Sequence, residues 1–75
     1  MHIIDEMFKE KLGRKIEALR TQKQLGVREF ALLADIEHHQ LINIEKGRVD
    51  IRLSTLIKIA KGFGVEAKEL LDFKI

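Results

Sequence analysis

The sequence predicts an all-α fold in which five short helices enclose one core. Three observations carry this prediction: the chain of 75 residues is 45% hydrophobic, it has no proline, and its apolar residues recur every three or four positions between glycines. A chain of this length can close only one core. We therefore expect a single domain over residues 1–75, with its core at about 8–72 and an N-terminal extension at 1–7.

The first helix is expected at about residues 7–23. Its apolar positions follow helical spacing and charged residues occupy the other faces. The apolar positions are Phe8, Leu12, Ile16 and Leu19. Gly26 follows and separates this helix from the next one.

The second helix is expected at 27–34. Its inward face is expected to consist of Phe30, Ala31, Leu33 and Ala34. The small side chain of Ala31 lets another helix approach closely.

The third helix is expected to follow almost at once, at about 37–46. Leu41, Ile44 and Glu45 share one of its faces. The residues that point elsewhere are His38, His39, Gln40 and Asn43. Gly47 suits the left-handed conformation that commonly ends a helix.

The fourth helix is expected to start near residue 53, and its apolar residues span a broad arc, so we expect it to be largely buried. These residues are Leu53, Leu56, Ile57, Ile59 and Ala60. Gly62 and Gly64 are expected to close it, and a last short helix is expected at about 66–71.

Composition and charge narrow the function classes. The chain has no cysteine, hence neither a disulfide framework nor a thiolate metal site, which fits a reducing compartment. No apolar run approaches the roughly 18 residues of a membrane span, so we expect a cytoplasmic protein.

The net charge is only +2, but residues 14–61 hold ten lysines and arginines against six aspartates and glutamates. This distribution supports a nucleic-acid partner without demanding one.

Neither catalysis nor metal binding is expected. The sequence has no glycine-rich phosphate loop and no serine with a plausible base nearby. His38 and His39 are adjacent on a helix and point about 100° apart, and His2 lies at the terminus, so these three do not form a metal site. We expect no enzymatic activity, no metal and no cofactor.

A dozen spaced positions, taken in order, resemble a known family. They are Leu12-Gly13, Ile16, Leu19-Arg20, Leu25, Phe30-Ala31, Ile36, Leu41, Ile44-Glu45-Lys46-Gly47, Leu53, Leu56, Ile59-Ala60, Phe63-Gly64-Val65 and Glu69-Leu70-Leu71. Together they resemble the Xre-type helix-turn-helix domains of phage lambda repressor and Cro relatives. The resemblance implies a five-helix lambda-repressor-like DNA-binding domain that binds operator DNA as a dimer.

The resemblance makes the third helix the recognition helix, which offers polar groups to base edges while its opposite face is anchored in the core. Base contacts are expected from His38, His39, Gln40 and Asn43. The two amide side chains can each pair with an adenine edge, and a histidine can donate to guanine or reach a phosphate. All four could equally be solvated polar residues of a helix surface. If a histidine binds phosphate as the cation, DNA affinity should fall as the pH rises from about 6 to 8.

Residues that flank the third helix are expected to contact phosphates. They are Arg28, Lys46, Arg48 and Arg52. Each of them alone could be a solvated surface charge, so the cluster counts for more than its members. The resemblance also implies an internal ion pair between Arg20 and Glu45, in which removing one partner would strand a buried charge.

The chain departs from the family pattern at the start of the second helix. Gly26-Val27 stands where Ser or Thr followed by Gln is usual, so Arg28 has to replace a phosphate-binding glutamine. Weaker N-caps than the usual Ser or Thr begin the last three helices: these are Glu37, Arg52 and Glu66. Glu37 could instead accept from a cytosine amino group or repel phosphates. Ile42 stands where a small polar residue is usual, and helix packing is its expected role, ahead of a thymine methyl or a partner protein.

Two apolar groups lie outside the expected core. They are Ile3, Ile4, Met7 and Phe8 at the N-terminus, and Leu71, Phe73 and Ile75 at the C-terminus. A monomer of this size would struggle to bury both groups, so we expect a two-fold homodimer. Its interface is expected to contain Phe8, Leu71, Phe73 and Ile75. The alternative is that these residues extend the core of a monomer.

These features predict a sequence-specific transcriptional regulator that binds double-stranded DNA. It would be a dimeric repressor reading a palindromic operator with its third helix, with half-sites about 10 bp apart. The alternative is a protein-interaction module of the same fold, antitoxin-like or regulator-binding, with weak or no specific DNA binding. The missing glutamine and Ile42 favour the alternative, whereas the basic cluster favours DNA.

Overall fold

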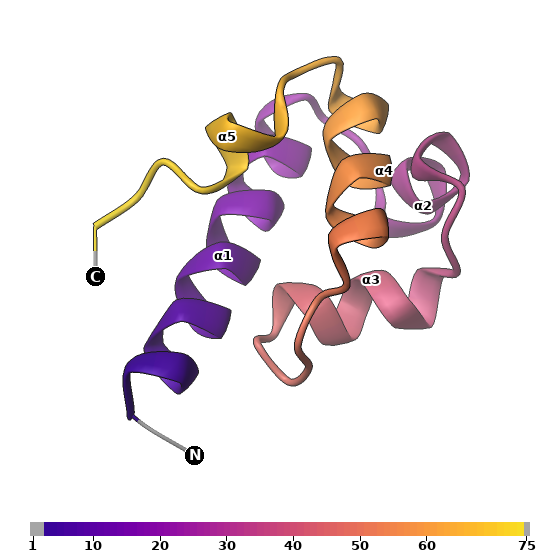
Figure 1. The fold of residues 1–75 in the computed structure, drawn as a ribbon. Helices are drawn as coiled ribbons and strands as arrows, with labels where there is room; N and C mark the ends of the chain where they lie inside the picture. Colours follow the sequence, from indigo (N-terminus) through magenta and orange to yellow (C-terminus); the bar gives the residue numbers. More distant parts are fainter. Residues whose placement is uncertain (1–2, 75) are drawn as a thin grey trace.

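A computed structural model describes residues 3–74, and the side chains of residues 5–74. Its helices are α1 (Ile3–Gln22), α2 (Val27–Ala34), α3 (His38–Glu45), α4 (Leu53–Phe63) and α5 (Ala67–Leu70). The predicted all-α class with five helices is thus confirmed. In Figure 1, α1 runs along one side, α4 and α2 form the other side, and α3 lies across one end of α4. The short α5 contacts both α1 and α4.

The first helix starts earlier than expected, at Ile3 instead of residue 7, and ends at Gln22. From residue 3 on, the expected N-terminal extension therefore forms the first turns of α1. Asp5 and Glu6 lie in the first turn, where negative charge stabilises a helix N-terminus. The periodicity of core residues did not reveal these turns because residues 5–7 are exposed.

The helix starts depend on unusual caps. The amide of Gly26, the N-cap of α2, donates a 2.9 Å hydrogen bond to the Glu29 carboxylate. The N-caps of α3, α4 and α5 are Glu37, Arg52 and Glu66, and none of them makes a side-chain capping hydrogen bond. The departure in the sequence thus has a structural counterpart, because the first amides of these helices have no acceptor on their own N-cap.

A short turn fixes the orientation of α3 relative to α2. Asp35 ends α2 in the left-handed conformation, with φ of 59°. The Ile36 amide donates back to the Ala31 carbonyl at 3.0 Å. Lys58 of α4 supports the turn, since its Nζ lies 3.3 Å from the Asp35 carbonyl oxygen and 3.7 Å from the Asp35 carboxylate.

The core is shared by all five helices. Its buried apolar residues are Leu12, Ile16, Phe30, Ala31, Ala34, Leu41, Ile44, Leu56, Ile59, Ala60, Phe63 and Leu70. The rings of Phe30 and Phe63 stack with their centroids 4.0 Å apart and thereby join α2 to α4. Burial on this scale, at about 25 cal/mol per Å² of apolar surface, is the main stabilising contribution available to a chain without disulfides.

Three leucine and isoleucine positions expected inside are exposed. Leu33 is 59% exposed, because the inward arc of α2 is set by Phe30, Ala31 and Ala34, and Leu33 lies beside that arc. Leu53, 70% exposed, is the first residue of α4, and Ile57, 40% exposed, lies about 100° around that helix from Leu56. The expectation that α4 is largely buried was therefore wrong for this side of the helix.

Two glycines permit close helix contacts. A Cβ on Gly13 of α1 would lie 2.5 Å from the Glu45 carbonyl oxygen, so α1 and α3 meet backbone to backbone here. Gly62, which was expected to end the fourth helix, lies inside α4, where a Cβ would be 3.1 Å from the Phe30 ring. The left-handed Gly64 ends α4, with φ of 73°, and Gly47 has a φ of 69° directly after α3.

None of the described helices combines the length and apolar character that a membrane span requires.

Candidate nucleic-acid interface

One face of α3 is anchored in the molecule. Leu41 and Ile44 are buried in the core, and Glu45 is buried beside them. The Glu45 carboxylate accepts two hydrogen bonds from Arg20 of α1, from Nε at 2.7 Å and from Nη2 at 3.0 Å. The remaining Nη1 of Arg20 donates to the Leu25 carbonyl at 2.8 Å. The Arg20 guanidinium therefore joins α1, the loop before α2 and the end of α3. Its contact with Glu45 has the geometry of a bidentate ion pair.

The same pair is electrostatically strong. The hydrogen bonds with Glu45 raise the pKa of Arg20 above its ordinary value, burial lowers it, and the negative charges of Glu45 and Glu17 add to the increase. Both residues are almost fully buried. A buried charge that loses its partner is costly, so each side chain requires the other.

The opposite face of α3 carries the four residues that were expected to contact bases. His39 and Gln40 are exposed, whereas His38 and Asn43 are half-buried. The rings of His38 and His39 lie against each other, with centroids 4.1 Å apart and planes tilted by 34°. The structure therefore brings the two histidines together, whereas Gln40 and Asn43 contact Thr55 and Arg48.

Arginines from three other segments lie beside these polar residues. His38 and Arg28 of α2 line one hollow of about 340 Å³. Gln40 and Arg52, the N-cap of α4, line another of about 210 Å³. The Asn43 Oδ1 accepts a 3.2 Å hydrogen bond from Arg48 Nη1.

The four basic residues that were expected to contact phosphates, Arg28, Lys46, Arg48 and Arg52, are all exposed. They come from α2, the end of α3 and the loop that leads to α4, so they flank α3 on several sides. Glu37, the N-cap of α3, is exposed, and its side chain makes no capping hydrogen bond. Gln40 contacts the Thr55 hydroxyl at 3.5 Å, the outer limit of a hydrogen bond, so its amide is only weakly held.

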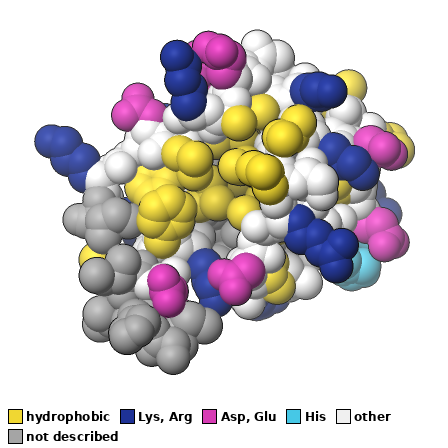
Figure 2. Space-filling model, in the orientation of Figure 1, with side chains coloured by type: hydrophobic (Ala, Val, Ile, Leu, Met, Phe, Trp, Pro, Cys, Tyr) yellow, Lys and Arg dark blue, Asp and Glu magenta, His cyan; other side chains and the backbone are white. Residues whose placement is uncertain are grey.

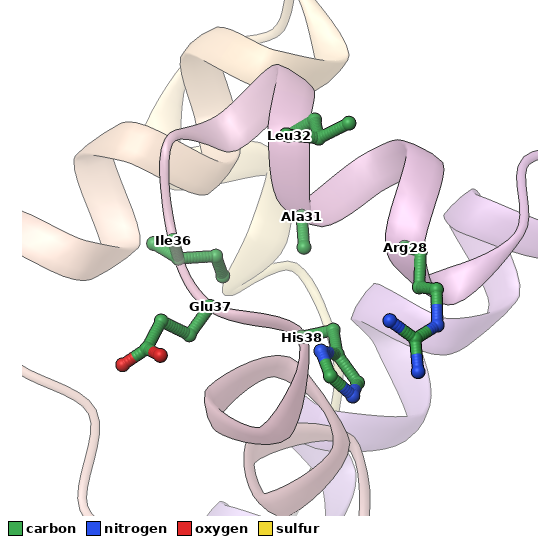
Figure 3. A pocket seen from close by; sticks show the side chains of 6 residues that line it. All are labelled: Arg28, Ala31, Leu32, Ile36, Glu37 and His38. Atoms are coloured by element: carbon green, nitrogen blue, oxygen red, sulfur yellow. The ribbon is translucent and has the colours of Figure 1, made fainter.

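His38 has a distinct electrostatic environment. Desolvation lowers its pKa, the positive charges of Arg28 and His39 lower it further, and Glu37 acts in the opposite direction. Figure 3 shows the imidazole of His38 and the guanidinium of Arg28 side by side at one end of the hollow, with Glu37 on the other side of the chain. In the unbound protein this environment therefore disfavours the protonated form of His38.

A second face of the molecule is apolar. Figure 2 shows hydrophobic side chains gathered over the region where α1, α4 and α5 meet. A hollow of about 320 Å³ opens there, and its lining includes Phe8, Val49, Leu53 and Leu71. Lys9 and Asp50, also in this lining, are 3.5 Å apart.

The residues expected at a dimer interface fall into three groups. Phe8 and Leu71 are each 40% exposed. Phe73 is half-buried and packs edge-on against Phe8, with ring centroids 5.1 Å apart, so it extends the core of its own chain. Ile75 lies outside the described residues, as do the side chains of Ile3 and Ile4.

Comparison with known proteins identifies the family. A family model for a helix-turn-helix domain matches residues 13–74. The chain belongs to this helix-turn-helix family. It is 32% identical over 62 residues to the control protein C.BamHI of Bacillus amyloliquefaciens, and the match covers 81% of this chain and 76% of that protein.

Solved structures agree with this assignment. The restriction-modification controller protein C.AhdI from Aeromonas hydrophila is similar with a TM-score of 0.79 and 28% identity, covering 81% of this chain and 92% of that one. A transcriptional regulator of the HTH_3 family from Vibrio cholerae has a TM-score of 0.84 and 29% identity, covering 88% of this chain and 37% of that one. The predicted Xre-type helix-turn-helix fold is thus confirmed.

In the helix-turn-helix domain described here, α2, the turn at residues 35–37 and α3 form the motif. Sequence reasoning missed three features near it: the Gly13 contact beneath α3, the Glu29 bond that replaces a polar cap, and the exposed Val49–Leu53 rim. The glycine within an amphipathic helix was the available signal for the first. Among the described residues, no group of three or more His, Asp or Glu could hold a metal ion.

Proposed function

We propose that this helix-turn-helix domain is a sequence-specific DNA-binding transcriptional regulator that inserts α3 into the major groove. The observation that carries the proposal is that the two faces of α3 differ. Leu41, Ile44 and the Arg20–Glu45 ion pair anchor one face in the molecule. The other face presents polar side chains that have arginines beside them. A recognition helix needs both a rigid seat and free donors and acceptors.

The exposed side chains suit base and phosphate recognition in different ways. Gln40 and Asn43 each carry an amide that can pair bidentately with adenine, and His39 can donate to guanine. Arg28, Lys46, Arg48 and Arg52 supply the positive charge that sets register on the phosphates. Arg48 now holds the Asn43 amide, and it would release this amide when it turns to a phosphate.

The apolar face supports a homodimer. Its hollow is lined by α1, the loop before α4, α4 and Leu71, and includes Ile44 at the end of α3. Large exposed apolar patches commonly mark protein contacts. A two-fold dimer through this face would carry two α3 helices, one for each half-site of a palindrome. We propose that this dimer acts as a repressor, because a protein bound to an operator can block access to it.

Selection of bound sequences from a random duplex library at about 150 mM salt tests this function. We expect enrichment of a palindrome whose half-sites lie about 10 bp apart. The double variant Gln40→Ala and Asn43→Ala should lose the enrichment, whereas Gln22→Ala, a change of an exposed glutamine on α1, should keep it. Absence of any enriched sequence would contradict the proposal.

One observation favours a second candidate, a protein-interaction module of the same fold. Leu32 and Leu33 are 83% and 59% exposed on α2, apart from the apolar face described above. Adjacent exposed leucines are a feature of protein contacts more than of phosphate contacts. This candidate predicts no enriched sequence and only weak DNA binding that is steeply dependent on salt.

A further inference from the structure

Arg28 and His38 come from different helices and meet at one hollow. Arg28 is the second residue of α2, and His38 is the first residue of α3. They line one hollow of about 340 Å³, and the rest of its lining consists of Ala31, Leu32, Ile36 and Glu37. Figure 3 shows the two nitrogen-bearing groups side by side at its rim. Because α2 and α3 both pack into the core, the backbone positions of the two residues are fixed relative to each other.

The charges around His38 are unbalanced in the unbound protein. Arg28 faces it from α2, His39 follows it on α3, and Glu37 precedes it in the turn. Glu37 also lines the hollow, but Figure 3 shows its carboxylate directed away from His38, whereas the Arg28 guanidinium lies next to the imidazole. An anion placed between His38 and Arg28 would offset the positive charge of Arg28 and so favour protonation of the imidazole.

We propose that a DNA phosphate binds between Arg28 and His38, and that His38 takes up one proton from solvent when it does so. The phosphate oxygen accepts a hydrogen bond from the guanidinium and another from the imidazolium. This site supplies a phosphate contact at the start of the motif, where Val27 offers none. The inference rests on the proposed DNA-binding role of this face. It assigns His38 to a contact with the DNA backbone and not with a base.

Proton uptake gives the coupling a definite sign. Burial and Arg28 hold the pKa of unbound His38 below its ordinary value, and a bound phosphate raises it. Between these two pKa values the complex carries one more proton than the separate molecules. DNA affinity therefore falls as the pH rises through that window, by at most tenfold per pH unit for a single proton.

Anisotropy titrations with a fluorescein-labelled 20-bp duplex of random sequence test the coupling from pH 5.5 to 8 at constant ionic strength. We expect the affinity of the wild-type protein to fall severalfold across this range. His38→Gln should remove the dependence on pH, whereas the matched variant His39→Gln should keep it. Arg28→Gln should weaken binding and reduce the dependence of log affinity on log salt by about one unit.

The pKa of His38, measured by NMR from its Cε1 proton, provides a test on the unaltered protein. We expect a higher pKa with the duplex than without it, and an increase in the unbound pKa in Arg28→Gln. An equal pKa in both states, or an unchanged dependence on pH in His38→Gln, would overturn the proposal. A random duplex separates this outcome from the proposed function, because phosphate binding can persist where the library yields no enriched sequence.

Discussion

At the scale of single residues, Arg20 and Glu45 form the contact with the largest predicted effect. Their carboxylate and guanidinium are buried and joined by two hydrogen bonds. We expect Arg20→Ala and Glu45→Ala each to lower the free energy of unfolding by roughly 3 kcal/mol, because each strands the other charge. Thermal unfolding measures this effect, with Arg14→Ala, an exposed arginine of α1, as the control.

The double variant sharpens the test. Once Arg20 is gone, removing Glu45 relieves a stranded charge, so the loss in the double variant should be smaller than the sum of the two single losses. Unchanged melting temperatures in both single variants would show that the pair does not stabilise the fold.

Single residues also show why burial is harder to predict than helix formation. The resemblance placed Arg20 and Glu45 in an ion pair, because a motif preserves the spacing that brings two such groups together. Leu33, Leu53 and Ile57 were expected inside, since they are large, apolar and helical. Their exposure depends on which neighbours cover each side of α2 and α4, and that information lies in the tertiary arrangement.

At the scale of elements, the crossing of α1 over α3 depends on Gly13. A methyl group there would press on the backbone at the end of α3, with a carbonyl oxygen of Glu45 only 2.5 Å away. We expect Gly13→Ala to destabilise the domain by up to about 2 kcal/mol net, since overpacking costs about 1–3 kcal/mol and alanine returns about 1 kcal/mol of helix propensity.

Chemical denaturation of Gly13→Ala tests this estimate. Ala18→Gly, at an exposed site of the same helix, calibrates helix propensity alone. A Gly13→Ala variant more stable than the wild-type protein would mean that α3 can move away without loss, contrary to a rigid seat for that helix.

The uncapped start of α3 offers a prediction of the opposite sign. Glu37 has the extended backbone of an N-cap, with φ of −79° and ψ of 148°, but its side chain makes no capping bond. We expect Glu37→Ser to raise stability by about 1 kcal/mol, because a serine hydroxyl can accept from a first-turn amide. Differential scanning calorimetry can detect the change, and Glu17→Ser on the exposed side of α1 should show no gain.

The same substitution bears on DNA. Removing the Glu37 carboxylate takes away a negative charge beside His38 and should strengthen binding at low salt. A loss of affinity in Glu37→Ser would instead support a contact between Glu37 and a base, the alternative that the sequence left open.

Element boundaries were predictable where caps and periodicity agree. α2 was predicted with the bounds that the structure gives, and α3 within one residue, because a glycine precedes the first and another follows the second. The start of α1 and the helical Gly62 were missed. The start of α1 depends on the charges at its N-terminus, and the helical conformation of Gly62 depends on tertiary packing. The spacing of apolar residues does not reveal either effect.

At the scale of the whole molecule, the apolar face should determine the oligomeric state. Leu53 is 70% exposed on the rim of the 320 Å³ hollow, beside Val49. A charge there should be tolerated by the monomer fold yet prevent burial against a second copy. We expect the wild-type protein to be dimeric by light scattering at tens of micromolar and Leu53→Glu to be monomeric.

Leu33→Glu is the matched control, because Leu33 is also exposed, at 59%, but lies on α2 and outside both hollows. This variant should remain dimeric. Since a dimer makes two sets of phosphate contacts, Leu53→Glu should also lose about half of the salt dependence of DNA binding. A wild-type protein that is monomeric at this concentration would instead mean that Phe8 and Phe73, already in contact with each other, merely extend the core of one chain. The palindrome would then have to be read by two domains that meet only on DNA.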